Sequence, residues 1–188
     1  MELPAPPPTP PIQIDRSINP IGFPDPALEQ VLRSHLFPPG ANPGACQRQG
    51  GLRYIYNRVD LDGDRNPETL VALLGRQGCG DKGCPVMLFR DLGRTITPLQ
   101  TLLGFHTALI VAERSTKGWR DLILPPSPGA QGVQPTLLSH DGQGYPIKPP
   151  IAVPEPSAAP ARGIAALVLK GSPYLVQGHS LPCPAAGG

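Results

Sequence analysis

The chain has 188 residues, enough for one domain with flanking segments, and its formal net charge is +2. Its basic residues are scattered singly, which argues against the clustered cationic surface of a nucleic-acid-binding protein. No apolar run approaches the roughly 20 residues of a membrane-spanning helix.

Prolines divide the chain into a core and its flanks. Only three of the 28 prolines fall between residues 52 and 124, whereas the first eleven residues contain six. We therefore predict a Pro-rich spacer at 1–16, a β-rich core domain at 17–145, a Pro-rich linker at 146–162 and a C-terminal segment at 163–188. Residues 1–11 of the spacer are expected to be extended polyproline II, and the C-terminal segment to be tied back to the core.

A helix is predicted to begin after Asp25. Asp25 is a good N-cap, Pro26 suits the first helical position, and Glu29 favours the positive end of the helix dipole. The apolar stripe of this helix consists of Leu28, Val31, Leu32 and Leu36.

Strands follow the helix. Residues 53–60 alternate, with Ile55 and Val59 on one face and Tyr54, Tyr56 and Arg58 on the other. Further predicted strands are 69–74, 86–89, 95–103, 107–113, 119–124 and 136–139. Strands so closely spaced, with no helix between them, predict antiparallel pairing.

Two later segments complete the expected fold. Asp141 and Gly142 predict a hairpin turn between 136–139 and Tyr145, and residues 163–170 are either a strand or a short helix. The fold class is therefore α+β and mostly β. We expect a single antiparallel sheet of about five to seven strands, with one N-terminal helix packed on it and disulfide bonds bracing it.

The four cysteines allow three pairings. Two glycines between Cys79 and Cys84 let the backbone turn sharply and predict a local disulfide, which leaves Cys46 to pair with Cys183 and fasten the tail to the core. The alternatives are four reduced thiols, or a zinc site made by Cys46, His179, Cys183 and one further cysteine. No Cys-x-x-Cys spacing supports the zinc site.

Disulfides point to an oxidising compartment, so we expect a periplasmic, extracellular or lipid-anchored protein. Met1 is followed directly by Glu-Leu-Pro and a Pro-rich stretch rather than by a signal peptide. Either the protein is cytosolic or the chain is a mature form with an added Met. A Pro-rich spacer commonly follows a cleaved signal or a lipid anchor, which favours the mature form.

An acidic loop carries the clearest chemistry in the sequence. Asp60, Asp62, Asp64 and Glu68 occupy positions 1, 3, 5 and 9 of one short segment, which is the spacing of hard oxygen donors in calcium loops. Carboxylates held about 5 Å apart repel one another by about 3 kcal/mol per pair at an effective dielectric near 20. A divalent cation would reverse the sign of that interaction.

The loop is not a regular EF-hand. That motif has Gly at position 6 and Glu at position 12, where this sequence has Arg65 and Val71. Arg65 would itself supply a counter-charge in place of a metal. A solvated Asp-rich turn without an ion therefore stays an alternative to calcium.

Several motifs occur in an order that resembles a family of uncharacterised small bacterial secreted or lipid-anchored proteins. They are Asp60-x-Asp62-Gly63-Asp64-x-x-Pro67-Glu68, Cys79-Gly80-x-x-Gly83-Cys84, Gly118-Trp119-x-Asp121-Leu122, and Asp141-Gly142 ahead of Tyr145. The resemblance covers roughly residues 50–146 and implies export and an oxidised Cys79–Cys84 pair. More distantly, the acidic loop resembles the calcium loops of FG-GAP propeller repeats, although one loop does not make a propeller. That second resemblance implies as ligands Asp60, Asp62, Asp64, the Asn66 carbonyl and Glu68.

The sequence contains no Gly-x-Ser-x-Gly elbow, His-Glu-x-x-His helix or phosphate-binding glycine loop. We therefore expect a non-enzymatic extracytoplasmic structural or protein-binding module, with a structural Ca²⁺ as its candidate cofactor and another envelope protein as its candidate partner. One alternative is a metal-dependent hydrolase that uses the acidic loop. The other is a protein inhibitor that inserts the loop between Cys79 and Cys84 into a partner.

Overall fold

The computed structural model describes residues 12–40, 51–76, 78–130, 133–146 and 161–183. Within them the chain forms one helix, α1 (Pro26–Leu36), and ten strands. The strands are β1 (Gln13–Ser17), β2 (Leu52–Val59), β3 (Glu68–Leu74), β4 (Cys84–Asp91), β5 (Ile96–Phe105), β6 (Ala108–Thr116), β7 (Trp119–Leu124), β8 (Thr136–Leu138), β9 (Arg162–Val168) and β10 (His179–Leu181). In the described part of the chain, no helix is long and apolar enough to span a membrane.

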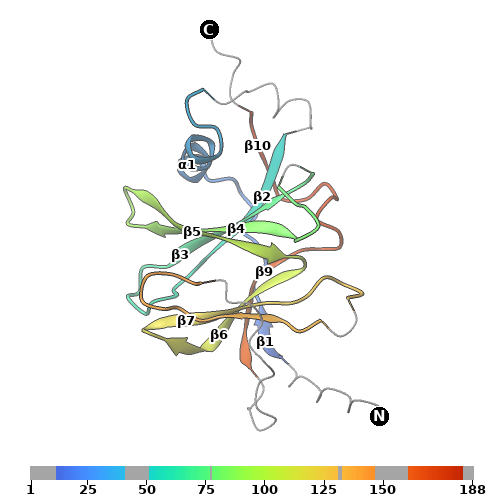
Figure 1. The fold of residues 1–188 in the computed structure, drawn as a ribbon. Coiled ribbons are helices and arrows are strands. Elements are labelled where there is room, and N and C mark those ends of the chain that lie inside the picture. Colours follow the sequence, from blue (N-terminus) through green and yellow to red (C-terminus); the bar gives the residue numbers. More distant parts are fainter. Residues whose placement is uncertain (1–11, 41–50, 77, 131–132, 147–160, 184–188) are drawn as a thin grey trace.

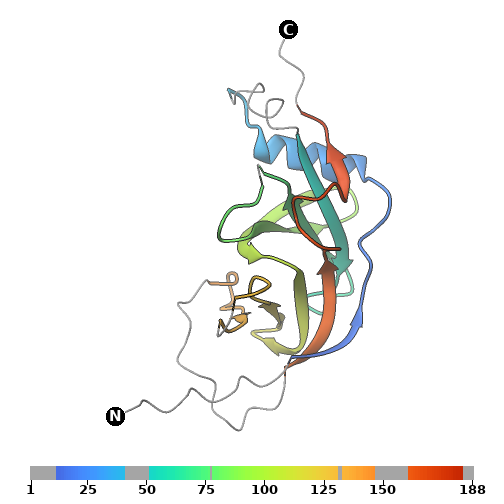
Figure 2. The same cartoon turned by 90° about the vertical axis from the view of Figure 1, so that its right-hand side faces the viewer.

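The strands form two sheets, so the prediction of a single sheet was wrong. One sheet, here called the β3 sheet, has the order β10-β2-β3-β4-β5, and the other, the β6 sheet, has the order β1-β9-β6-β7-β8. The two sheets form separate layers (Figures 1 and 2). The pairing is antiparallel as predicted, except that β1 runs parallel to β9. Since β9 pairs with β6 from far along the sequence, local strand patterns did not reveal the second layer.

The main hydrophobic core lies between the two sheets. Ile55 and Val59 of β2 point into it, and Val111 of β6 and Leu167 of β9 meet them from the other layer. Residues on both faces of β3 are buried, because the inter-sheet core covers one face and the helix layer the other. This double burial explains why residues 70–74 form an uninterrupted apolar run.

Helix α1 covers the outer face of the β3 sheet, as predicted (Figure 1). Its N-cap is Asp25, whose side chain accepts hydrogen bonds from the backbone N–H groups of Ala27 and Leu28. Leu28 and Leu32 are fully buried against the outward-facing side chains of the sheet. Burying each leucine contributes about 2 kcal/mol. The Tyr54 hydroxyl donates to Glu29 Oε1 at 2.8 Å and fixes the position of the helix.

One buried amide links the two layers. Asn57 of β2 is 3% exposed, and its Nδ2 donates to the carbonyl of Ala166 in β9 at 2.8 Å and to that of Asn19 at 3.0 Å. A longer contact of 3.5 Å reaches the carbonyl of Ile18. The side chain therefore ties the β3 sheet to the β6 sheet and to the segment that leads into α1.

The C-terminal part of the chain contributes a strand to each sheet. Residues 163–170, left open between strand and helix, fall mainly in β9. Strand β10, which the sequence did not predict, pairs with the edge of β2. The predicted boundary at 16 falls inside β1, and the one at 162 falls at the first residue of β9.

The turn predicted at Asp141 is formed, but it does not join two strands. The Asp141 backbone N–H donates to the carbonyl of Gly144, and the Asp141 side chain accepts from the N–H groups of Gln143 and Gly144. Tyr145 follows outside any strand, whereas β8 pairs with β7. The hairpin interpretation was therefore wrong for this segment.

Candidate functional site

The acidic loop connects β2 to β3 and is anchored by a buried leucine. Leu61 is fully buried; its backbone N–H donates to Glu68 Oε2 at 2.9 Å, and its carbonyl accepts from the N–H of Arg120 at 2.7 Å. The loop is therefore held by the core, by the first residue of β3 and by a strand of the other sheet.

Asp60 organises the turn of this loop. Its Oδ1 accepts from the backbone N–H of Gly63 at 2.7 Å, and its Oδ2 from that of Arg65 at 3.1 Å. Both partners have a positive φ, +79° for Gly63 and +71° for Arg65. Glycine adopts this conformation freely, whereas at Arg65 the bond to Asp60 helps to offset its cost.

The next two aspartates extend the same pattern. Asp62 Oδ1 accepts from the N–H of Asp64, and Asp64 Oδ1 accepts from the N–H of Asn66. Hydrogen bonds from the backbone and side chain of Asn66 lower the pKa of the exposed Asp64 carboxyl. The loop thus turns its carboxylates inward upon its own backbone amides.

The structure brings three of the five predicted ligands together. Asp60, Asp62 and Glu68, here called the acidic trio, each place a carboxylate oxygen within 4.8 Å of the others. Asp64 and Asn66, which the sequence also proposed as ligands, are exposed residues outside this group. Glu68 is 1% exposed, and burial raises the pKa of its carboxyl. The N–H of Leu61 opposes that shift, and the charge of Asp62 adds to it.

Arg90 of β4 supplies a counter-charge that the sequence analysis assigned to Arg65. Its Nη2 lies 2.9 Å from Asp62 Oδ2, and its Nε lies 3.9 Å from Glu68 Oε1. The guanidinium also lies over the ring of Trp119, 5.5 Å from its centroid. Sequence reasoning missed Arg90 because it follows a buried run and reaches the loop only through strand pairing.

An aromatic cluster adjoins this arginine. The rings of Trp119 and His140 stack at 4.6 Å with an interplanar angle of 7°, and Tyr145 meets His140 edge-on at 5.0 Å. His140 Nδ1 accepts from the N–H of Gly142, so that nitrogen carries no proton. Burial lowers the pKa of the His140 imidazole.

A small hollow of ≈ 220 Å³ is lined by Arg90 and by the rings of Trp119, His140 and Tyr145. A hydrolytic metal requires an open coordination position next to such a hollow. Arg90 lines the hollow and also binds Asp62. The positively charged guanidinium of Arg90, and not an open coordination position, therefore lies between the hollow and the acidic trio. This arrangement gives the hydrolase alternative little support.

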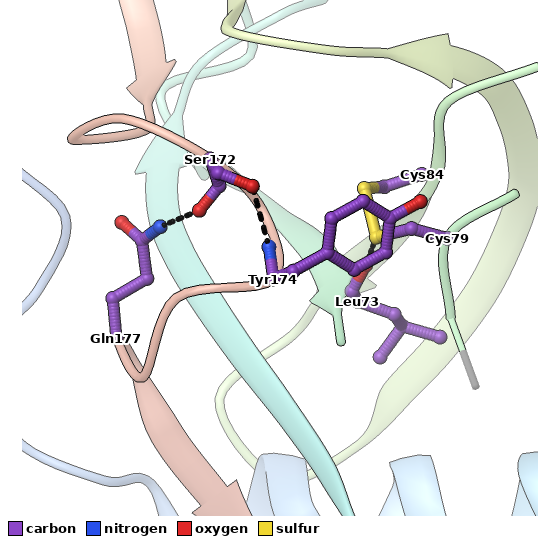
Figure 3. Close-up of a disulfide and its surroundings, with 6 residues drawn as sticks. All are labelled: Leu73, Cys79, Cys84, Ser172, Tyr174 and Gln177. Atoms are coloured by element: carbon purple, nitrogen blue, oxygen red, sulfur yellow. Dashed lines mark hydrogen bonds between the residues drawn. A yellow bond between two sulfur atoms is a disulfide. The ribbon is translucent and has the colours of Figure 1, made fainter. Parts of the chain in front are cut away.

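The predicted Cys79–Cys84 disulfide is present at the opposite end of β3 (Figure 3). Gly80 and Gly83 exchange two backbone hydrogen bonds, so only Asp81 and Lys82 form the tip of the turn. Cys84 is fully buried and Cys79 is 9% exposed. Only two residues protrude beyond the buried disulfide, which is too short a loop to insert into the active site of another protein. This weakens the inhibitor alternative.

The second predicted disulfide, Cys46–Cys183, involves Cys46, which lies outside the described residues. The pairing of Leu181 with Leu52 places the end of β10 next to the start of β2. This geometry brings Cys183 close to Gly51, the first described residue after the segment that contains Cys46. The pairing stays a prediction.

A second hollow of ≈ 560 Å³ lies next to the Cys79–Cys84 turn, and its lining includes His106, Ser172 and Tyr174. Figure 3 shows Tyr174 extending toward the disulfide from the connection between β9 and β10.

Comparison with protein-family models, curated proteins and solved structures gave no significant match. Functional inference therefore rests on the chain itself.

Proposed function

We propose that this chain is a non-enzymatic extracytoplasmic structural module whose acidic loop binds a stabilising Ca²⁺ ion. The observation that supports it is the convergence of Asp60, Asp62 and Glu68 within 4.8 Å. Carboxylate oxygens are the ligands that Ca²⁺ prefers, and its flexible coordination tolerates an irregular loop. Backbone carbonyls and water would complete the coordination shell.

Electrostatics favours a cation at this position. At an effective dielectric near 20, each pair of carboxylates at this separation repels by about 3 kcal/mol. Arg90 supplies one positive charge against the three negative charges of the acidic trio when all three are ionised. A divalent ion would compensate the remaining two charges and would also favour the ionised form of the buried Glu68.

The Cys79–Cys84 disulfide supports an extracytoplasmic location, because such bonds persist mainly in oxidising compartments. A structural module of that compartment would hold or position another envelope protein. A local disulfide at one end of β3 and an ion-bound loop at the other would hold both ends of the strand.

A thermal melt tests the ion site. If Kd is about 1 mM, about 10 mM Ca²⁺ should stabilise the folded chain by about 1.4 kcal/mol, or roughly 3–5 °C in Tm. EGTA should reverse the shift, and NaCl at matched ionic strength should not reproduce it. No shift at this concentration would refute the ion site.

Two variants of the same loop make the test specific. Asp62→Asn removes one member of the acidic trio and should abolish most of the Ca²⁺-dependent shift. Asp64→Asn changes an exposed carboxylate outside the trio and should leave most of the shift intact. Equal responses of the two variants would mean that Ca²⁺ acts through general screening and not through this site.

A further inference from the structure

The connection between β9 and β10 exposes three large apolar side chains in succession. Tyr174 is 54% exposed, Leu175 58% and Val176 85%. Single exposed apolar residues are ordinary on protein surfaces, but contiguous ones mark sites of interaction. We call Tyr174, Leu175 and Val176 the apolar tip.

Two backbone N–H groups of the apolar tip are hydrogen-bonded within its own loop, those of Tyr174 and Leu175 (Figure 3). The N–H of Tyr174 donates to Ser172 Oγ, and the N–H of Leu175 donates to the Ser172 carbonyl. Gln177 Nε2 donates to the same carbonyl at 2.9 Å, and Gln177 Oε1 accepts from the N–H of Lys170. The apolar tip therefore reaches a nonpolar medium without leaving these amide groups unpaired.

The loop is also tied to the β3 sheet. The N–H of Gly75 donates to the carbonyl of Pro173 at 3.2 Å. The guanidinium of Arg53 donates to the carbonyls of Gln177 and Gly178. Because the loop is held in place before any contact, little conformational entropy is lost when the apolar tip binds.

Four basic residues lie in the apolar tip's own loop or in segments next to it. Arg53 binds the base of the loop, Lys170 starts it, Arg76 follows the residue that binds Pro173, and Lys82 lies on the neighbouring disulfide turn. In the described residues of the loops at 75–84, 105–108, 125–130 and 169–179, Asp81 is the one carboxylate. The acidic loop lies at the other end of β2, about 23 Å away for seven residue steps of a strand (Figure 1).

We propose that the apolar tip binds an anionic lipid surface. Leu175 and Val176 would enter the boundary between headgroups and acyl chains, and the neighbouring cations would face the anionic headgroups. A protein partner would fit the apolar residues equally well, but cations on three separate segments (β2, the connection between β3 and β4, and the connection between β9 and β10) match a continuous sheet of negative charge. The proposal does not depend on Ca²⁺ at the acidic trio.

Vesicle co-sedimentation of the full chain tests this binding. Vesicles of about 30% phosphatidylglycerol in phosphatidylcholine should bind the protein at least fivefold more strongly than pure phosphatidylcholine vesicles. Raising the salt from about 0.05 M to 0.5 M should weaken binding, because the Debye length falls below about 5 Å. Absence of binding to the anionic vesicles at low salt would overturn the proposal, even if a protein partner were found.

Variants separate the two contributions. Leu175→Ser with Val176→Ser should reduce vesicle binding at least fivefold, and Lys82→Glu with Lys170→Glu should do the same for anionic vesicles only. Leu137→Ser changes an equally exposed leucine on β8 and should bind like the parent chain. Unchanged melting temperatures would show that the variants are folded. Equal binding by the tip and Leu137 variants would place the lipid contact elsewhere and refute the proposal.

Discussion

The amide of Asn57 gives a direct test of how the two sheets are joined. Asn57→Ala removes the donor that serves the carbonyls of Ala166 and Asn19 across the interior. A hydrogen bond contributes about 0.5–1.5 kcal/mol, and a buried group left without a partner costs about 1–3 kcal/mol. We therefore expect the alanine variant to lose about 2–3 kcal/mol of the free energy of unfolding.

Asn57→Asp sharpens the test because it keeps the shape of the side chain and replaces its NH₂ group by oxygen. A carboxylate facing carbonyl oxygens in a buried position has a raised pKa in the folded state. Between the unfolded pKa near 4 and that raised value, the folded state binds the extra proton. Its stability therefore falls as the pH rises, by up to about 1.4 kcal/mol for each pH unit.

Urea unfolding followed by the fluorescence of Trp119 measures both effects. Taking the difference between the aspartate and alanine variants at pH 5 and pH 7 cancels every other titrating group. Gln30→Glu, on the exposed face of α1, is the matched amide-to-carboxylate control and should change stability by no more than about 0.5 kcal/mol. If Asn57→Asp is as stable as the parent chain at pH 7, this amide does not link the layers.

Two further predictions follow from backbone geometry and from histidine burial. Gly178→Ala places a Cβ 2.4 Å from the carbonyl oxygen of Tyr54. Gly129 also has a positive φ, but a Cβ there meets no atom within 4 Å, so Gly129→Ala is the matched control. In urea unfolding, Gly178→Ala should lose at least about 1 kcal/mol more of the free energy of unfolding than Gly129→Ala. Because burial lowers the pKa of His140, stability should be fully present above pH 6.5 and decline as the pH falls below it. The stability difference between the parent chain and the His140→Phe variant isolates this decline from the opposite contribution of Glu68, and a difference that is flat between pH 7 and pH 5 would contradict the assignment.

Local signals predicted the elements whose structure is set locally. The Asp25–Pro26 pair located the start of α1, and alternation placed Ile55 and Val59 opposite Tyr54. The division into two sheets was not predictable, because burial on both faces of a strand produces the same apolar run in one sheet or in a sandwich. Strand β1 was missed since all five of its residues are exposed, and no apolar period marks it.

The acidic trio was partly predictable. The spacing of Asp60, Asp62 and Glu68 identified the loop, but Arg90 entered the site through the pairing of β3 with β4. The register of β3 on β4 does not follow from the disulfide turn. In the turn Gly80 opposes Gly83, whereas in the strands Ala72 opposes Val86. The β3 side therefore has more residues between these two pairs than the β4 side. Turn position alone would have paired Arg90 with the wrong residue.

The contribution of residues 162–181 to both sheets bears on when the two layers can form during synthesis. Strand β9 is inserted between β1 and β6, and β10 closes the edge of β2, so each layer forms only after residues beyond 161 have been made. Pairings over such sequence distances form slowly. A stop codon at any position before 162 would remove a strand from both layers at once, leaving no half of the molecule that retains a finished layer.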